Sequence, residues 1–379
     1  MELEQFRAGL DAWLDENESA LRQSVADGTA GDSLEAHFAQ LKKVKAAAYD
    51  AGWVRYGWPS SVGGLGGSPI LRAYLGETLM ARNLVDPGTY SMIEVLVPTA
   101  LDYMDPALAA EVVPPLLRGD ESWCQGFSEP STGSNLSALT CRATPTEGGW
   151  LVNGQKVWTS YAQFAERCVL LTRTGTPESM HRGITAFFVD MDSPGITVRP
   201  LQTIHGVEEF SEVFFDDVFV PASRLLGEVD KGWSIAMDLL PYERSTALWH
   251  RGAFLQRNLG DLIDVAPAGS LDPSALGAVA QQLYAFRARS RGTQWRLHNG
   301  EKLASETSID KVQLALLEQS IFDLAADALA EQVVLGDDEN AEHWRSAYLY
   351  SRASTIYGGS YEIQRNIIAR RVLNLGDEG

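Results

Sequence analysis

The sequence predicts a mostly helical protein with a β domain in the middle of the chain, and three observations lead to that prediction. Apolar residues recur at helical spacing within the first 121 residues. They then fall into short runs rich in β-branched and aromatic residues, a pattern typical of strands. Helical spacing returns after Gly232. We therefore expect an N-terminal helical domain (1–121), a middle β domain (122–228) and a C-terminal helical domain (229–379).

In the first domain, Phe6, Leu10 and Leu14 repeat at four-residue steps and predict a helix. A second apolar face runs from Leu41 to Ala48. The remaining elements expected here are helices over 70–80 and 106–117, a loop over 28–32 and a loop rich in glycine and proline over 57–67.

In the middle domain, Asn153-Gly154 stands between two short apolar runs and predicts a tight hairpin. Further strands are expected over 169–171, 184–189 and 213–215. The turn residues between them favour a small antiparallel barrel or sandwich. For the last domain the periodicity predicts long helices over 233–263, 273–299, 309–334, 341–355 and 361–372.

Composition limits the classes of partner. The chain has 379 residues, 31 Lys and Arg against 50 Asp and Glu, and a net charge of −19, which disfavours binding to nucleic acid or to anionic lipid. No run of about 18 uncharged apolar residues predicts a membrane span, and the acidic start does not resemble a signal peptide. Cys124, Cys141 and Cys168 show no close pair spacing, so we expect a reduced, cytoplasmic protein without a zinc knuckle.

Several common catalytic motifs are absent from the sequence. It has no G-x-G-x-x-G after a strand, no P-loop, no H-E-x-x-H and no G-x-S-x-G, and its six histidines are scattered. We therefore expect no metal site. What remains is the hydroxyl-rich segment from Cys124 to Asn135, whose donors suit a flat heterocycle or a pyrophosphate. Taken alone, its composition favours a polar connecting loop.

Five segments resemble the motifs of one enzyme family. Residues 128–135, Ser-Glu-Pro-Ser-Thr-Gly-Ser-Asn, are similar to T/S-E-P-x-A-G-S-D of the acyl-CoA dehydrogenases, with Asn135 in place of the usual Asp. The other four segments, one before this segment and three after it, occur in the family's order and span almost the whole chain. They are W-P-x-x-x-G-G at 58–64, N-G-x-K-x-W at 153–158, V-F-F-D-D-V-x-V-P at 213–221 and I-Y-x-G-x-x-E-I-Q-R-N-I-I at 356–368. The resemblance implies a helical domain, a β domain and a helical domain, in agreement with the periodicity.

The resemblance also implies an FAD site. It places the Ser128 hydroxyl at the flavin ring, the Trp158 indole over one flavin face and Ser134 at the start of the substrate site. Without its flanking motif, Trp158 would be interpreted as part of a strand core. The FAD-binding residues that the motifs imply are Gln125, Phe127, Ser128, Gly133, Ser134, Trp158, Thr159, Ser160, Ser360, Tyr361, Glu362 and Ile363.

The catalytic base of many family members is a Glu at the position that Gly358 holds here. Isovaleryl-type members carry it instead on the helix after the β domain, directly before an Arg, where this chain has Glu243-Arg244. The resemblance thus implies that Glu243 removes the α-proton of an acyl-CoA while hydride passes to flavin N5, giving the trans-2-enoyl-CoA. From the residues alone, an E-R pair favours a surface ion pair. The substrate contacts implied are Ser134, Tyr242, Arg244, Gly358 and Gly359, with the Gly358 N–H at the thioester carbonyl.

Two family motifs are degraded. The R-x-x-F-G motif, which reaches a neighbouring subunit's FAD, has no secure match near 284–292, and Q-x-x-G-G is altered at 331–336. The resemblance implies a homodimer or homotetramer, and these losses leave room for a heterotetramer. It also implies electron-transfer flavoprotein as the electron acceptor. Two alternatives stay open, an acyl-CoA oxidase and a non-catalytic subunit of a heteromeric enzyme, as does the acyl chain.

Overall fold

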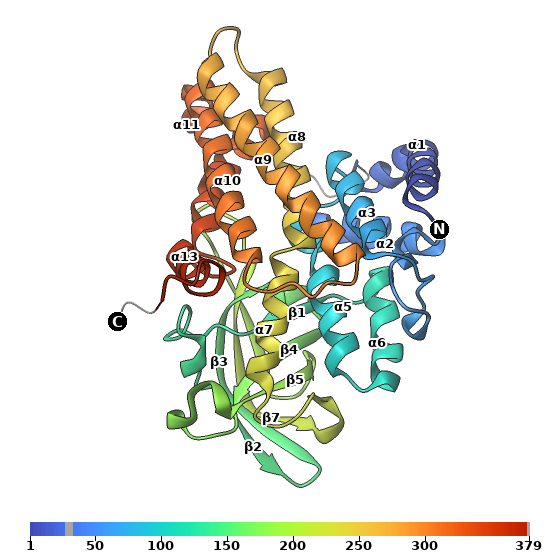
Figure 1. Ribbon diagram of the computed structural model, residues 1–379, viewed down its shortest axis with the longest axis vertical. Helices are drawn as coiled ribbons and strands as arrows, with labels where there is room; N and C mark the ends of the chain where they lie inside the picture. Colours follow the sequence, from blue (N-terminus) through green and yellow to red (C-terminus); the bar gives the residue numbers. More distant parts are fainter. Residues whose placement is uncertain (27–32, 377–379) are drawn as a thin grey trace. The chain divides into compact units, whose positions relative to one another are not determined.

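The computed structural model describes residues 1–26 and 33–376, so the loop expected over 28–32 lies outside the described residues. Figure 1 shows the chain coloured along the sequence, with most of its helices and strands labelled. The chain divides into two compact units. The first unit comprises Met1–Leu71, Gly88–Thr203 and Val207–Leu240, and the second comprises Arg72–Pro87, Ile204–Gly206 and Pro241–Gly379. The three-domain boundaries expected from the sequence stay a prediction.

Amphipathic helices make up the N-terminal part of the first unit. Phe6, Leu10 and Leu14 are fully buried, as their spacing predicts. The helices are α1 (Leu3–Ala26), α2 (Leu34–Asp50), α5 (Met92–Tyr103) and α6 (Pro106–Arg118). Three others, α3 (Pro69–Ala81), α4 (Pro87–Tyr90) and α7 (Gly232–Glu243), run from one unit into the other.

The first unit also contains an eight-stranded sheet in the order β6-β7-β3-β2-β4-β5-β8, with β1 paired to β4. Most neighbours are antiparallel, whereas β1 and β2 each pair with β4 in parallel. The strands are β1 (Trp123–Gly126), β2 (Arg142–Thr146), β3 (Gly149–Ser160), β4 (Arg167–Arg173), β5 (Ile184–Asp190), β6 (Ile196–Leu201), β7 (Phe210–Pro221) and β8 (Leu225–Leu226). The predicted fold class, mostly helical with a central β domain, is confirmed.

The hairpin predicted at Asn153-Gly154 is wrong. Strand β3 runs straight through these residues, and the β2–β3 turn lies at 147–148. Gly154 instead accommodates an irregularity in the pairing of β3 with β7, with φ = +143° and no room for a Cβ beside Cys141. The Asn153 side chain bonds to Asp217 across the ladder. Asn153-Gly154 therefore forms a bulge and not a turn, although both structures favour a glycine at positive φ.

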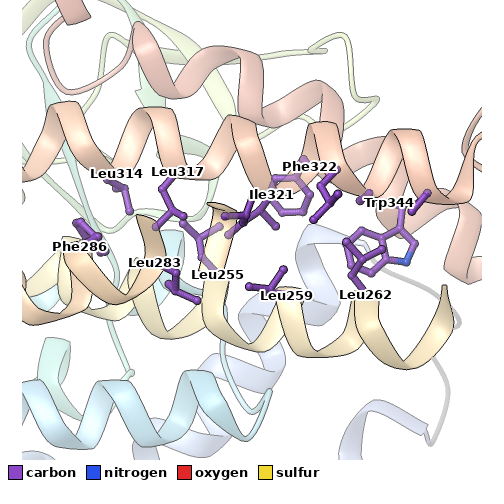
Figure 2. Packing of buried hydrophobic residues seen from close by; sticks show 14 of the residues in the cluster. Leu255, Leu259, Leu262, Leu283, Phe286, Leu314, Leu317, Ile321, Phe322 and Trp344 are labelled. Atoms are coloured by element: carbon purple, nitrogen blue, oxygen red, sulfur yellow. The ribbon is translucent and has the colours of Figure 1, made fainter. Parts of the chain in front are cut away.

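Long helices dominate the second unit. Leu255 on α8, Phe286 on α9 and Ile321 on α10 contribute to one apolar cluster, shown in Figure 2. The helices are α8 (Thr246–Val265), α9 (Pro273–His298), α10 (Thr307–Leu329), α11 (Glu331–Leu335), α12 (Glu339–Ser351) and α13 (Tyr361–Ile367), the last continued by the π-helical turn η8 (Ile368–Val372).

The single helix predicted over 233–263 is wrong, because the chain breaks between α7 and α8. Pro241 lies in the last turn of α7, where it donates no backbone hydrogen bond. Ser245 then leaves helical geometry, with φ = −124° and ψ = −95°. A similar break at Ala330 (φ = +41°) divides the helix predicted over 309–334. Glu243 and Arg244, two of the site residues that the sequence predicts, stand at the first break.

Candidate active site

The Glu243 side chain is half-buried at the C-terminal end of α7 and lies beside the glycine pair that precedes α13. Gly358 has φ = +62°. A Cβ atom on residue 358 would lie 2.7 Å from Glu243 Oε1 and 3.4 Å from Lys311 Cε. The carboxylate of Glu243 therefore occupies the space that a side chain at 358 would need. A side chain at either position would reach the same point.

Arg244 holds the glycine pair in place. Its Nε and Nη2 donate to the Gly358 carbonyl at 3.2 and 3.0 Å, and Gln364 Nε2 donates to the same oxygen at 3.1 Å. Burial lowers the pKa of Arg244, while the neighbouring Glu243 opposes that shift. Within residues 1–26 and 33–376, no acceptor bonds to the backbone N–H of Gly358 or of Gly359. Both amides are thus available to a ligand oxygen.

Two further groups complete this surface. The Ser360 hydroxyl accepts from the Ile363 amide at 3.4 Å and caps α13, whose first turn contains Tyr361 and Glu362. Gly359 has φ = +92°, and a Cβ there would lie 2.3 Å from Gln364 Nε2. Only glycine fits this approach of backbone to side chain.

Lys311 is a charged residue of this site that the sequence analysis missed. Its side chain is buried, its Nζ donates to the Ser354 carbonyl at 2.6 Å and lies 3.9 Å from the centre of the Tyr357 ring. Burial lowers the pKa of Lys311 to about 8, although Glu318 and Glu243 oppose that shift. A signal existed, because Lys311 shares the inward face of α10 with Leu314 and Ala315 at helical spacing.

The second group of predicted residues lies in the first unit, where β1 leads into the hydroxyl-rich loop. Ser128 is half-buried, whereas Gly133 and Ser134 are exposed, and a Cβ on Gly133 would meet no atom within 4 Å. The Ser128 carbonyl accepts from the Val157 amide at 2.9 Å. This bond ties the loop to β3, directly before Trp158.

Trp158 is the unusual residue of β3. Its side chain is 59% exposed, its φ is +59°, and its ring makes an edge contact with Phe210 at 5.9 Å between centroids. Positive φ is uncommon for a bulky residue. Next to it, the Thr159 hydroxyl is buried and has no hydrogen-bond partner among the described residues. An uncovered indole plane beside an unused hydroxyl fits a planar ring with polar edge atoms, so these residues fit a flavin.

The predicted residues therefore form two groups. The residues of the first unit are Gln125, Phe127, Ser128, Gly133, Ser134, Trp158, Thr159 and Ser160, and those of the second are Tyr242, Glu243, Arg244, Gly358, Gly359, Ser360, Tyr361, Glu362 and Ile363. In the described part of the chain, no cluster of His, Cys, Asp or Glu could hold a metal ion. No helix in that part is long and apolar enough to cross a membrane.

Comparison with known proteins identifies the class. Residues 124–218 match the acyl-CoA dehydrogenase middle domain, and residues 230–373 match the acyl-CoA dehydrogenase C-terminal domain. The acyl-CoA dehydrogenase IpdE1 of Mycobacterium tuberculosis is 33% identical over 384 residues, covering 100% of this chain and 99% of that protein. The chain belongs to the acyl-CoA dehydrogenase family. It is a flavoprotein oxidoreductase of lipid catabolism, as the resemblance in the sequence implies.

Solved structures share the fold. The Tcur3481-Tcur3483 steroid ACAD superimposes with a TM-score of 0.83 at 23% identity, covering 99% of this chain and 98% of that one. A chain of the ChsE4-ChsE5 complex from Mycobacterium tuberculosis superimposes with a TM-score of 0.79, also at 23% identity, covering 99% of this chain and 98% of that one.

Proposed function

We propose that the protein converts an acyl-CoA thioester to the trans-2-enoyl-CoA, with Glu243 removing the α-proton. The observation that supports this most directly is the position of its carboxylate, which fills the space beside Gly358 and adjoins two free backbone amides. Enolisation of a thioester requires a base and, close to it, a hydrogen-bond donor to the carbonyl oxygen, because negative charge moves onto that oxygen as the proton leaves.

Arg244 and Gln364 position these donors. Both bond to the Gly358 carbonyl, which fixes the peptide plane that holds the Gly359 N–H and restrains the Gly358 N–H one residue away. The Gly358 N–H would bind the thioester oxygen, and Gly359 and Tyr242 would contact the substrate nearby. Fixed donors stabilise a developing oxyanion without reorganising during the reaction.

We infer that the flavin is FAD. Gln125, Phe127, Ser128, Gly133, Ser134 and the segment from Trp158 to Ser160 would hold it. From the C-terminal sequence motif we also propose FAD contacts for Ser360, Tyr361, Glu362 and Ile363. Bound FAD would supply a hydride acceptor for the β-carbon. The indole of Trp158 would cover a ring face, and the Ser128 and Thr159 hydroxyls would donate to its polar edge.

For partners, we propose electron-transfer flavoprotein as the electron acceptor and an oligomer as the working form. The names of the two solved structures with the same fold, Tcur3481-Tcur3483 and ChsE4-ChsE5, each join two proteins, and this chain lacks the R-x-x-F-G motif. A heterotetramer is therefore proposed beside a homodimer or homotetramer. The three cysteines are free and buried, in keeping with a cytoplasmic protein.

Anaerobic reduction of the purified protein with a panel of acyl-CoA esters tests the proposal. The panel should run from short straight chains to a steroid-type side chain, because one solved structure with the same fold is a steroid ACAD. We expect a yellow protein that releases FAD on denaturation and is bleached by at least one ester. A colourless protein that takes up no added FAD would contradict the proposal and favour a non-catalytic subunit. Peroxide release in air, without another acceptor, would indicate the oxidase instead.

A further inference from the structure

Strand β3 leaves the ladder at the residue proposed to cover the flavin. Lys156 pairs with Val213 of β7, and the next paired residue is Thr159, opposite Ser211. Val157 and Trp158 thus lie in an irregularity where β7 does not fix them in register. Since Trp158 also holds a positive φ, the ladder alone does not account for its conformation.

Three hydrogen bonds from another segment hold β3 at this point. The Val157 amide donates to the Ser128 carbonyl at 2.9 Å, and Lys156 Nζ donates to the Phe127 carbonyl at 3.1 Å. Lys156 Nζ also donates to Glu129 Oε1 at 2.8 Å. The Lys156 and Glu129 side chains are 0% and 2% exposed. The loop that carries Ser128 is therefore bonded to the strand residues that directly precede Trp158.

The Glu129 carboxylate also closes the far end of the same loop. Its Oε2 accepts from the Thr140 amide and hydroxyl, both at 2.7 Å, and its Oε1 accepts from the Cys141 amide at 2.9 Å. Burial opposes ionisation, yet Lys156 and these amides hold the pKa of Glu129 below its ordinary value. Each oxygen of the Glu129 carboxylate therefore accepts two hydrogen bonds, and these four bonds stabilise its charged form.

We propose that the buried Glu129–Lys156 pair is a clamp that fixes the flavin-facing loop against β3, so that Ser128 and Trp158 are pre-positioned for the flavin. This inference rests on the proposed function for the identity of the ligand. Glu129 and Lys156 act through Ser128 and Trp158, so they are positioning residues. The sequence motifs contain both residues, but neither was assigned a role.

A double substitution separates positioning from mere stability. Losing one member leaves a buried charge without its partner, which destabilises the fold, whereas a neutral replacement of both is often tolerated. In Glu129→Gln the amide nitrogen cannot accept from Thr140. In Lys156→Met the Phe127 carbonyl loses its donor. The double variant E129Q/K156M has no unpaired charge but also has no clamp.

The experiment compares the full-length wild type, both single variants and the double variant. The matched control is Glu301→Gln, which breaks the surface pair of Glu301 with Arg296, in which both side chains are about two-fifths exposed or more. Three quantities are measured: the dissociation constant for FAD added to the apoprotein, the thermal midpoint, and deuterium uptake by peptides that cover 124–141 and 153–161.

We expect the double variant to melt above both single variants, yet to bind FAD at least about tenfold more weakly than wild type, with faster exchange in both peptides. The control should match wild type in all three. If the single variants do not fold, the double variant decides the outcome. A double variant with wild-type affinity and exchange would overturn the clamp. If the wild type takes up no flavin, the proposed function fails, and the exchange data decide the clamp by themselves, with unchanged uptake overturning it.

Discussion

The substitution Gly358→Ala displaces the carboxylate of the proposed base but leaves its chemical identity unchanged. Residue 358 has φ = +62°, and the added Cβ would lie 2.7 Å from Glu243 Oε1. Ordinary contacts begin at 3.4 Å, so the carboxylate must retreat by about 0.7 Å, the difference between these two distances. A misplacement of about 1 Å costs on the order of 100-fold in rate.

The same substitution also strains the backbone, and a control removes that effect. A Cβ in the left-handed region costs about 1–2 kcal/mol. Gly300 is exposed, has φ = +76° and has no atom within 4 Å of a Cβ, so Gly300→Ala carries the strain alone. The difference between the two variants measures the local effect of the added Cβ at residue 358, which is the displacement of Glu243 together with any shift of the Gly358 N–H.

The assay is stopped-flow reduction of the bound flavin by the best acyl-CoA ester, with unfolding in urea to report stability. We expect both variants to lose about 1–2 kcal/mol of unfolding free energy, and only Gly358→Ala to slow reduction by roughly 100-fold with FAD retained. If Gly358→Ala reduces its flavin as fast as Gly300→Ala, Glu243 does not work from the place that the structure gives it.

Two further predictions concern the second unit. His250 is fully buried, and desolvation, against weaker backbone hydrogen bonds, lowers its pKa to about 3 from 6.5. The unfolded chain therefore binds more protons than the folded one between pH 6.5 and pH 3, and stability falls as the pH drops through that window. We expect His250→Gln to reduce the slope of unfolding free energy against pH by up to about 1.4 kcal/mol per pH unit, measured by urea unfolding at several pH values. Equal slopes in wild type and variant would show that His250 does not cause the pH dependence. Leu255→Ala, at a fully buried position of the core in Figure 2, should lower the unfolding free energy by about 2–5 kcal/mol, measured by the same method. A loss under about 1 kcal/mol would mean that this cluster is loosely packed.

Periodicity alone predicted the order of helical and β regions, because burying one face of each element imposes its own spacing on the apolar residues. It failed where backbone geometry depends on distant residues. Asn153-Gly154 satisfies a turn and a bulge equally well, and only the pairing of β3 with β7 decides between them. The break after Pro241 was missed although an interior proline tends to kink or end a helix. Helices α5 and α6 also contain prolines, and only the backbone angles of Ser245 show where the helical geometry stops.

The candidate site was predictable to the extent that motifs mark it. The motifs identified Glu243 and Gly358 as site residues. They did not show that the Glu243 carboxylate fills the space beside Gly358. Lys311 and the Glu129–Lys156 pair are charged residues buried by the tertiary fold, and spacing along the chain does not reveal such partners. Burial of a charge depends on which elements pack around it, and that is a property of the tertiary structure.

The central claim is that Glu243 takes the α-proton, and the rate of anaerobic flavin reduction in Glu243→Gln tests it most directly. The amide keeps the size of the side chain and cannot accept the proton, so we predict a fall of about 100- to 10,000-fold. FAD content and thermal midpoint should match wild type, as should all three quantities in the exposed control Glu339→Gln. A Glu243→Gln variant that holds FAD and is reduced at the wild-type rate would contradict the account.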